Sequence, residues 1–74
     1  MKLKIKDGVD LKELKKFGLV YRTEKSVERY EWEETNQDGY YYVVVYCWNR
    51  HICANSNNKL FDLIKADMVE KEEE

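Results

Sequence analysis

A turn signal at Asp38-Gly39 separates two segments of opposite pattern, and it constrains the fold more than any other feature of this sequence. Before it, residues 27–35 alternate between aromatic and charged side chains. After it, residues 40–48 (YYYVVVYCW) are apolar on both faces. Asp-Gly between two such segments is among the strongest signals for a β-hairpin. The sequence therefore predicts two antiparallel strands, of which the second is central and covered on both sides.

The loop length fixes how side chains sort between the two faces of this hairpin. If Asp38-Gly39 is a two-residue loop, Trp32 lies opposite Val45 and Tyr30 lies opposite Cys47. A four-residue loop preserves the same division, whereas an odd-length loop reverses one strand relative to the other. The expected core face carries Tyr30, Trp32, Tyr41, Val43, Val45 and Cys47, and the expected outer face carries Arg29, Glu31, Glu33, Tyr42, Val44, Tyr46 and Trp48.

Two helices flank the predicted strands. Asp10 and Glu13 have the spacing of a capping box, and Gly18 is placed to end the helix in the left-handed region, which predicts a helix over residues 11–17. A second helix begins after Ser56, with apolar residues at helical spacing from Leu60 to Met68. A weak internal repeat aligns residues 11–20 with 60–69, so we expect this helix to stop near Ala66 and Asp67 to take the place of Gly18.

Shorter strand-like segments complete the fold. Residues 19–22 predict one strand, and residues 51–55 predict another after a turn at Asn49-Arg50; residues 1–6 add a candidate edge strand. We therefore expect an α+β fold: a small antiparallel sheet of three to four strands with two helices on one face, in the order α-β-β-β-β-α. The expected single domain spans residues 1–70, followed by a frayed acidic tail over residues 71–74.

A chain of 74 residues buries only a modest share of its surface, so the largest side chains are expected to supply the core. With 14% aromatic residues, the sequence offers several such side chains. The predicted aromatic core consists of Phe17, Tyr21, Tyr30, Trp32, Tyr41 and Phe61.

Few residues have the spacing of a reactive or ligand-binding site. Cys47, His51 and Cys53 form C-x3-H-x-C, which is one ligand short of a structural zinc site. In the predicted register Cys47 points inward and Cys53 outward, so we expect two reduced thiols and no disulfide. No third group orients His51 for thiol catalysis, and the three glycines form no phosphate-binding loop. We therefore expect no enzyme activity, no catalytic residues, no metal and no cofactor.

Charge and hydropathy exclude several classes of protein. The net charge of −2 argues against a general nucleic-acid coat protein, and no apolar run is long enough to cross a membrane. The opening MKLKIKDG is basic but lacks the apolar stretch of a signal peptide. We expect a cytoplasmic protein.

The opening K-x-K-D-G-V-D-L-K-E-L-K-K-F-G, the tyrosine-rich middle and the closing L-F-D-L-I-K-A-D-M-V-E-K resemble small proteins of unassigned function encoded by Firmicutes phages and prophages. The resemblance spans most of the chain. In that group glycine is more common where Asp67 stands. The resemblance implies a phage or mobile-element origin and carries over no catalytic residue.

The outer sheet face is the predicted functional surface. Two short helices cover one side of a small sheet, so the other side is left for a partner. Tyrosine and tryptophan are enriched at the hot spots of protein interfaces, and this face carries three of them beside charged residues. We expect a protein-binding module that docks a host protein or a second copy of itself, and the candidate site residues are Tyr42, Tyr46, Trp48, Glu31, Glu33 and Arg29.

The alternative function is nucleic-acid binding, by sheet aromatics that stack bases and by the lysine-rich N-terminal region. Residues 11–22 also resemble the recognition helix and first wing strand of winged-helix DNA-binding domains. Only ten residues precede this segment, whereas a helix-turn-helix needs earlier helices. Glu31 and Glu33 beside the aromatics oppose a phosphate backbone.

Overall fold

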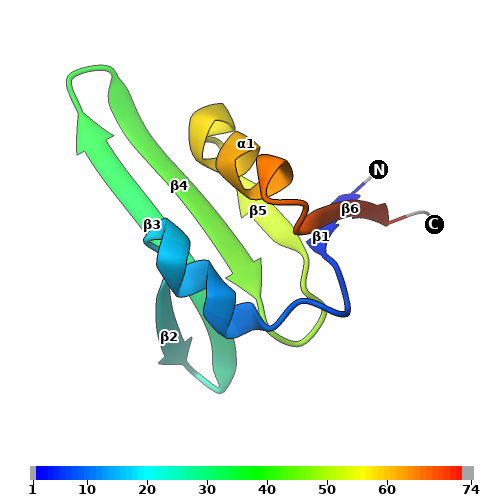
Figure 1. The fold of residues 1–74 in the computed structure, drawn as a ribbon. Helices are drawn as coiled ribbons and strands as arrows, with labels where there is room; N and C mark the ends of the chain where they lie inside the picture. Colours follow the sequence, from blue (N-terminus) through cyan, green and yellow to red (C-terminus); the bar gives the residue numbers. More distant parts are fainter. Residues whose placement is uncertain (1, 73–74) are drawn as a thin grey trace.

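The computed structural model describes residues 2–72 and consists of six antiparallel strands in two sheets with two short helices (Figure 1). A four-stranded sheet has the order β2-β3-β4-β5, and a two-stranded sheet pairs β1 with β6. In chain order the elements are β1 (Lys2–Ile5), the 3₁₀ helix η1 (Leu11–Phe17), β2 (Val20–Glu24), β3 (Val27–Asn36), β4 (Gly39–Tyr46), β5 (Ile52–Ala54), α1 (Asn57–Lys65) and β6 (Val69–Glu72). The predicted order of two helices around four strands is confirmed, and β1 and β6 are added outside it.

Helix η1 has the predicted bounds, but it is a 3₁₀ helix. The Asp10 carboxylate accepts a hydrogen bond from the backbone N–H of Lys12 at 2.9 Å, so Asp10 is the expected N-cap. The Glu13 carboxylate forms an ion pair with Lys16 at 2.6 Å, so the predicted capping box is reduced to the hydrogen bond that Asp10 accepts. Gly18 ends the helix at φ 89°, a conformation that favours glycine.

The end of α1 repeats the end of η1. Leu19 donates its N–H to the Leu14 carbonyl at 3.3 Å, and Met68 donates to the Leu63 carbonyl at the same distance. Asp67 has φ 61°, which is the left-handed conformation expected from its alignment with Gly18. In both cases a buried leucine, a left-handed residue and a second buried apolar residue lead directly into a strand. The internal repeat therefore corresponds to a shared helix-to-strand turn.

The β3–β4 turn is displaced by one residue from the predicted position. Asn36 pairs with Gly39, so the loop is Gln37-Asp38, and Trp32 lies opposite Val43 instead of Val45. The Asn36 side chain accepts a hydrogen bond from the Asp38 N–H at 2.8 Å, which draws the turn toward the N-terminus. Because the register moves by two residues, every side chain keeps its predicted face.

The β4–β5 connection is longer than predicted and removes Trp48 from the sheet. Strand β4 ends at Tyr46, and β5 pairs through Val45↔Ile52, so the loop has four residues instead of the two expected at Asn49-Arg50. The Arg50 guanidinium donates hydrogen bonds to the carbonyls of Lys6 and Val9 at 2.8 and 2.7 Å, which ties this loop to the N-terminal segment. This register also moves by two residues, so the predicted faces of Cys47 and Cys53 are unchanged.

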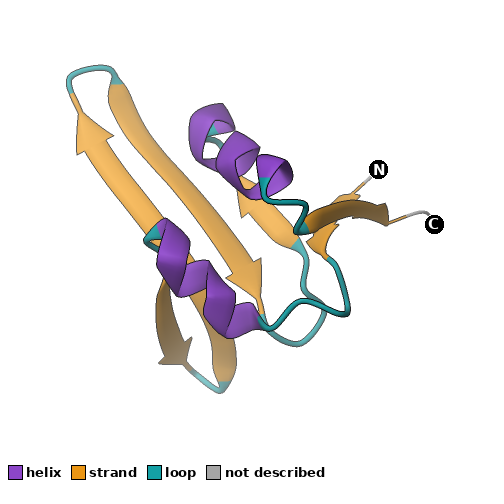
Figure 2. Cartoon of the chain, in the orientation of Figure 1, coloured by secondary structure: helices purple, strands orange, loops and turns teal. Residues whose placement is uncertain are grey.

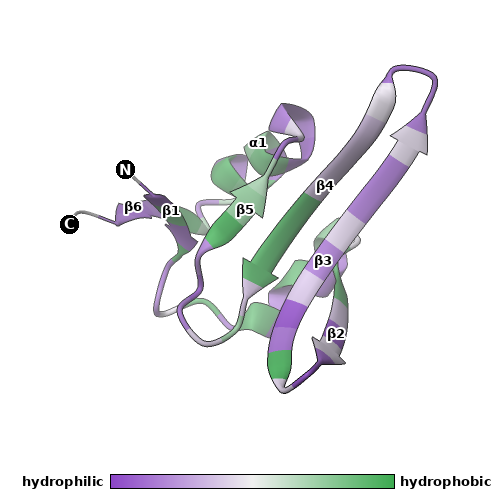
Figure 3. Ribbon diagram, turned by 180° about the vertical axis from the view of Figure 1, so that it is seen from behind, coloured by the Kyte–Doolittle hydropathy of each residue, from purple (hydrophilic) through white to green (hydrophobic). Residues whose placement is uncertain are grey.

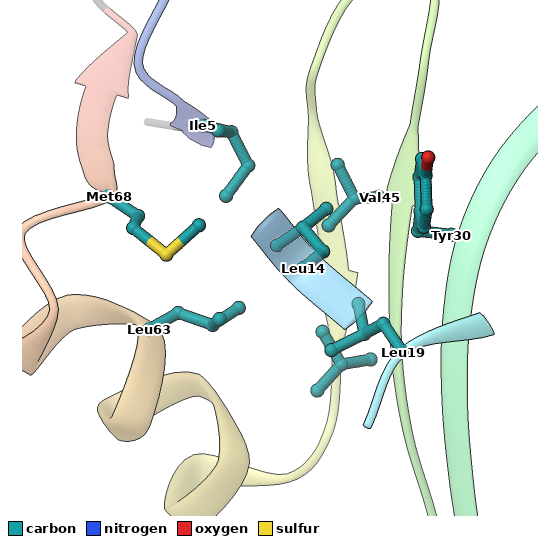
Figure 4. Packing of buried hydrophobic residues seen from close by; sticks show 8 residues of the cluster. Ile5, Leu14, Leu19, Tyr30, Val45, Leu63 and Met68 are labelled. Atoms are coloured by element: carbon teal, nitrogen blue, oxygen red, sulfur yellow. The ribbon is translucent and has the colours of Figure 1, made fainter. Parts of the chain in front are cut away.

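The core is mainly aliphatic, in contrast to the predicted aromatic core. Tyr30 is the only one of the six predicted aromatics in the buried cluster, whereas Tyr21 and Phe61 are 41% and 54% exposed. The labelled side chains come from segments far apart in the chain, and most of them are aliphatic (Figure 4). The buried hydrophobic residues are Ile5, Leu14, Leu19, Tyr30, Val43, Val45, Leu63 and Met68, while Phe17 and Trp32 pack at the margin.

Strand β1 confirms the expected strand at the N-terminus but pairs mainly with β6, through Lys2↔Glu72 to Ile5↔Val69. One bridge, Lys4↔His51, connects it to the residue before β5. Strand β6 continues to Glu72, beyond the expected boundary at residue 70. Residues 73 and 74 of the expected tail lie outside the described residues.

Both helices cover the same face of the four-stranded sheet, as predicted. Figure 2 shows η1 and α1 on the near side of the sheet, and Figure 3 shows the opposite side with the strands in front. Beyond the ends of β2 and β5, the β3–β4 hairpin extends as a two-stranded ribbon, here called the hairpin arm (residues 32–42). In residues 2–72, no helix is long and apolar enough to cross a membrane.

Candidate functional site

The outer face of the sheet is the side that neither helix covers (Figure 3). Its cross-strand pairs place charged residues of β3 opposite tyrosines and a valine of β4: Arg29↔Tyr46, Glu31↔Val44 and Glu33↔Tyr42. The pairing of β2 with β3 extends the same face toward the sheet edge. The outer face thus consists of Val20, Arg22, Glu24, Val27, Arg29, Glu31, Glu33, Thr35, Tyr40, Tyr42, Val44, Tyr46 and Cys53.

An ion-pair network occupies the β2 side of this face. The Arg29 guanidinium contacts Glu31 at 2.8 Å and Glu24 at 3.3 Å, and the Arg22 guanidinium contacts Glu31 at 2.6 Å. The hydrogen bond to Glu31 is the main cause that raises the pKa of Arg29. Both arginines are therefore held in place by carboxylates of neighbouring strands before any partner arrives.

The hairpin-arm end of the outer face is acidic and aromatic. Glu33 accepts a hydrogen bond from the Tyr40 hydroxyl at 2.8 Å, and this bond raises the pKa of Tyr40. The rings of Tyr40 and Tyr42 lie with their centroids 5.9 Å apart. Within residues 2–72, no cationic side chain lies within ion-pairing distance of Glu33. The sequence contains no lysine or arginine between residues 30 and 49.

The structure brings five of the six predicted site residues onto this one face: Arg29, Glu31, Glu33, Tyr42 and Tyr46. Trp48 is the exception, because it lies in the loop after β4 and its residue is 79% exposed. Tyr40 and Arg22 were missed. Tyr40 shares the parity of Tyr42 and could have been found by continuing the alternation to the turn. Arg22 could not have been found from the sequence, because its place opposite Arg29 depends on the tight Lys25-Ser26 turn. Both turn residues have positive φ, 51° and 67°, but neither is the glycine or asparagine that usually marks such a turn.

The two cysteines of the C-x3-H-x-C segment have different surroundings. Cys53 is exposed and pairs with Val44 on the outer face, whereas Cys47 packs against the core cluster. His51 contacts Asn49 through Nδ1 and Glu72 through Nε2. Burial raises the pKa of the Cys47 thiol, which disfavours the nucleophilic thiolate. Among residues 2–72, no cluster of histidine, cysteine or acidic side chains could hold a metal ion.

The lysines of η1 do not lie on the same face as the sheet tyrosines, whereas Lys2 lines a hollow together with Tyr46. Lys12, Lys15 and Lys16 belong to η1, which covers the opposite face. Lys4 and Lys6 form ion pairs with Asp7 at 2.9 Å and Asp67 at 2.6 Å. The structure therefore separates the η1 lysines, but not Lys2, from the sheet aromatics on which nucleic-acid binding was predicted.

Comparisons with known proteins identify no relative: no family model matches the chain, and neither a curated protein nor a solved structure matches it significantly.

Proposed function

We propose that this chain is a non-enzymatic protein-binding module and that the outer face of the sheet is its docking surface. The observation that carries the proposal is an uncovered sheet face that carries three tyrosines and two arginines, and both arginines are already fixed by ion pairs. Tyrosine and arginine dominate the binding energy of many protein interfaces. Side chains that are ordered before binding lose less conformational entropy when a partner docks.

The docking surface is hollowed beside Tyr46. Tyr46, Cys53 and Leu3 are among the residues that line a cavity of about 350 Å³ near β5 and β1. A partner side chain that fills such a hollow is desolvated on several sides, and hot-spot residues are typically found in settings of this kind. We therefore place the centre of the docking surface near Tyr46 and Tyr42, with the arginine network and Glu33 at its rim.

The charge of the outer face favours a different protein over a second copy as the partner. Arg22 and Arg29 are engaged by Glu24 and Glu31, so Glu33 is left as surplus negative charge. A second copy would bring the same surplus to the interface, whereas a partner with basic residues would neutralise it. The resemblance to phage and prophage proteins makes a host protein the expected partner.

Site-specific photo-crosslinking tests this surface. A p-benzoylphenylalanine replaces Tyr42 on the outer face or Tyr21, which pairs with Tyr30 on the core face, in cells that make the protein. We expect an adduct with one protein from position 42 and none from position 21, because the two side chains lie on opposite faces of the sheet. The adduct must re-form with the purified partner. Equal adducts from both positions, or an adduct only from position 21, would contradict the proposal.

The choice between self-association and a different partner is tested by the solution mass. We expect a monomer of 9.0 kDa at micromolar concentration. A dimer that Tyr46→Ala dissociates without unfolding the chain would instead identify a second copy as the occupant. The double variant Tyr46→Ala/Trp48→Ala should lose the crosslinked partner while keeping its folded circular dichroism spectrum.

Nucleic-acid binding is the less favoured alternative, since the sheet tyrosines and the η1 lysines lie on opposite faces. Affinity for single- or double-stranded DNA that falls steeply with salt would favour this alternative. The protein-binding proposal expects no DNA binding even at low salt.

A further inference from the structure

A second surface lies on the other side of the hairpin arm. A groove of about 950 Å³ separates the arm from α1. Figure 1 shows α1 beside the arm, with α1 on the helix-covered side of the sheet. Trp32 and Tyr41 of the arm and Phe61 of α1 contribute aromatic rings to its lining. Phe61 is 54% exposed although it is among the most apolar side chains in the chain. The groove is large enough for several side chains of a bound segment.

The rings of this groove already bind cations of the same chain. The Lys59 ammonium lies 4.7 Å from the Trp32 ring centroid, and the Lys65 ammonium lies 5.1 Å from the Phe61 ring centroid. Aromatic faces attract cations through their quadrupole. Lys59 is further fixed, because it donates a hydrogen bond to the Phe17 carbonyl at 2.9 Å. Within residues 2–72, the Phe61 ring is the only partner of the Lys65 ammonium. A cation from another protein can therefore replace it.

Carboxylates face this groove from both sides. Glu34 and Asp38 belong to the arm, and Asp62 belongs to α1. Across residues 2–72, no lysine, arginine or histidine forms an ion pair with any of the three. Charge-assisted hydrogen bonds from a guanidinium or an ammonium would satisfy these oxygens. Aromatic rings and unpaired carboxylates together are the chemistry that recognises a positively charged side chain.

We infer that the groove between the hairpin arm and α1 binds an extended, arginine-bearing segment of a protein, with a guanidinium replacing Lys65 over the Phe61 ring and contacting the carboxylates of the arm. Arginine fits this role better than lysine because its planar guanidinium stacks on a ring and donates hydrogen bonds at its edge simultaneously. This site is separate from the outer face, and it stands or falls independently of the proposed function.

Titration with a defined peptide tests the inference by NMR. The probe is a capped Gly-Arg-Gly-Arg-Gly peptide, and its matched control carries citrulline, which is neutral but has nearly the same shape. The indole N–H of Trp32 reports on the groove, while that of Trp48, which does not line it, serves as an internal control. We expect the arginine peptide to shift the Trp32 signal, the citrulline peptide to shift it far less, and Trp48 to remain unchanged.

Variants separate this groove from the rest of the acidic arm. Glu34→Gln/Asp38→Asn should weaken binding by about two- to fivefold for each carboxylate removed. Glu33→Gln removes the neighbouring charge on the outer face and should leave the affinity unchanged. Lys65→Ala removes the internal competitor and should tighten binding by a similar factor.

Several results would overturn the inference. Equal shifts from the arginine and citrulline peptides would show that charge is not recognised. A shift of Trp48 instead of Trp32 would move binding to another surface. No gain from Lys65→Ala would show that the lysine does not occupy the site. Binding of an oligothymidine at Trp32 with higher affinity than the peptide would assign the groove to nucleic acid.

Discussion

At the scale of single residues, the left-handed residues that end the two helices are the most constrained positions. Gly18 has φ 89°, and a Cβ atom built there would meet Trp32 Cδ1 at 3.5 Å, which is an ordinary contact. The cost of a side chain at this position is therefore backbone strain and not a clash. Asp67 adopts the same region with φ 61°, which aspartate tolerates better than most residues.

Gly18→Ala is expected to lower the free energy of unfolding by about 1 kcal/mol, because alanine disfavours the left-handed region. Chemical denaturation of the purified variant measures the change. Gly8→Ala is the matched control, since a Cβ there meets nothing within 4 Å and Gly8 is not among the positive-φ glycines. Equal effects of the two substitutions would contradict the role assigned to Gly18.

Tyr21 should be the last tyrosine to ionise. The Tyr21 hydroxyl donates a hydrogen bond to the Glu28 carboxylate, and this bond is the main cause that raises the pKa of Tyr21 from 10.0 to about 12. Because the folded-state pKa lies above the unfolded value, the stability from this bond is full below pH 10 and is lost as the pH rises toward 12. Absorbance at 295 nm measures the titration. Glu28→Gln should move one tyrosine toward its ordinary pKa; an unchanged titration curve would contradict the contact.

The ends of both helices could be predicted from sequence because they depend on neighbours a few residues away. Asp10, Gly18 and Ser56 act through local hydrogen bonds and a local backbone preference. The exact turn could not be predicted, because the Asn36 side chain competes with the Asp38-Gly39 signal. Local pattern still determined the faces, since a displacement of two residues preserves the alternation.

At the scale of elements, the hairpin arm depends on Asn55 at the edge of β4. The Asn55 side chain accepts a hydrogen bond from the Tyr42 N–H at 2.7 Å and donates one to the Tyr40 carbonyl at 3.0 Å. Strand β5 ends at Ala54, and the Asn55 N–H still donates to the Tyr42 carbonyl at 3.1 Å. The side-chain amide continues the pairing from there toward the turn. An isolated two-stranded ribbon is marginally stable, and this cap supports it.

Asn55→Ala is expected to lower the free energy of unfolding by about 1 kcal/mol, because it removes two hydrogen bonds to the β4 edge. Hydrogen exchange of the Tyr42 amide should also become faster. Asn57→Ala serves as the control, since it changes an exposed residue in the first turn of α1. Unchanged exchange at Tyr42 in the Asn55 variant would show that the amide does not cap this edge.

Thiol labelling tests the register of β4 and β5. Cys53 is exposed on the outer face, while Cys47 is partly buried and burial raises its pKa. We expect an aromatic disulfide reagent to modify Cys53 well before Cys47 at neutral pH, because the thiolate is the reactive form. The variants Cys47→Ser and Cys53→Ser assign the two rates. Faster modification of Cys47 would place it on the solvent side and contradict the register.

At the scale of the whole molecule, the composition of the core was the main failure of sequence-based prediction. The largest rings were expected inside, yet Tyr21 and Phe61 are exposed and Ile5, Leu14 and Leu63 are fully buried. Helices η1 and α1 place Leu14 and Leu63 against Val43 and Val45 of the sheet, so aliphatic side chains fill the space between the helices and the sheet. No pattern within one element specifies which side chains meet at that centre.

The outer face was more predictable than the core. Its members follow from alternation along β3 and β4, which requires no knowledge of the helices. The groove beside α1 could not be predicted, because it depends on how the arm and the helix are placed relative to one another. Trp48 was misplaced for a related reason: Arg50 binds carbonyls of the N-terminal segment, 44 and 41 residues away, and so sets the length of the loop.

The sorting of aromatic rings between a helix-covered face and an uncovered face is tested most directly by NOE spectroscopy of the folded protein. We expect the rings of Tyr30 and Trp32 to show contacts with methyl groups of Leu14, Leu19 or Leu63, and the rings of Tyr42 and Tyr46 to show none with those of Leu14 and Leu19. The reverse result would be contacts of the Tyr42 and Tyr46 rings with Leu14 and no contact of the Trp32 ring with either helix. That result would contradict the fold and with it the proposed docking surface.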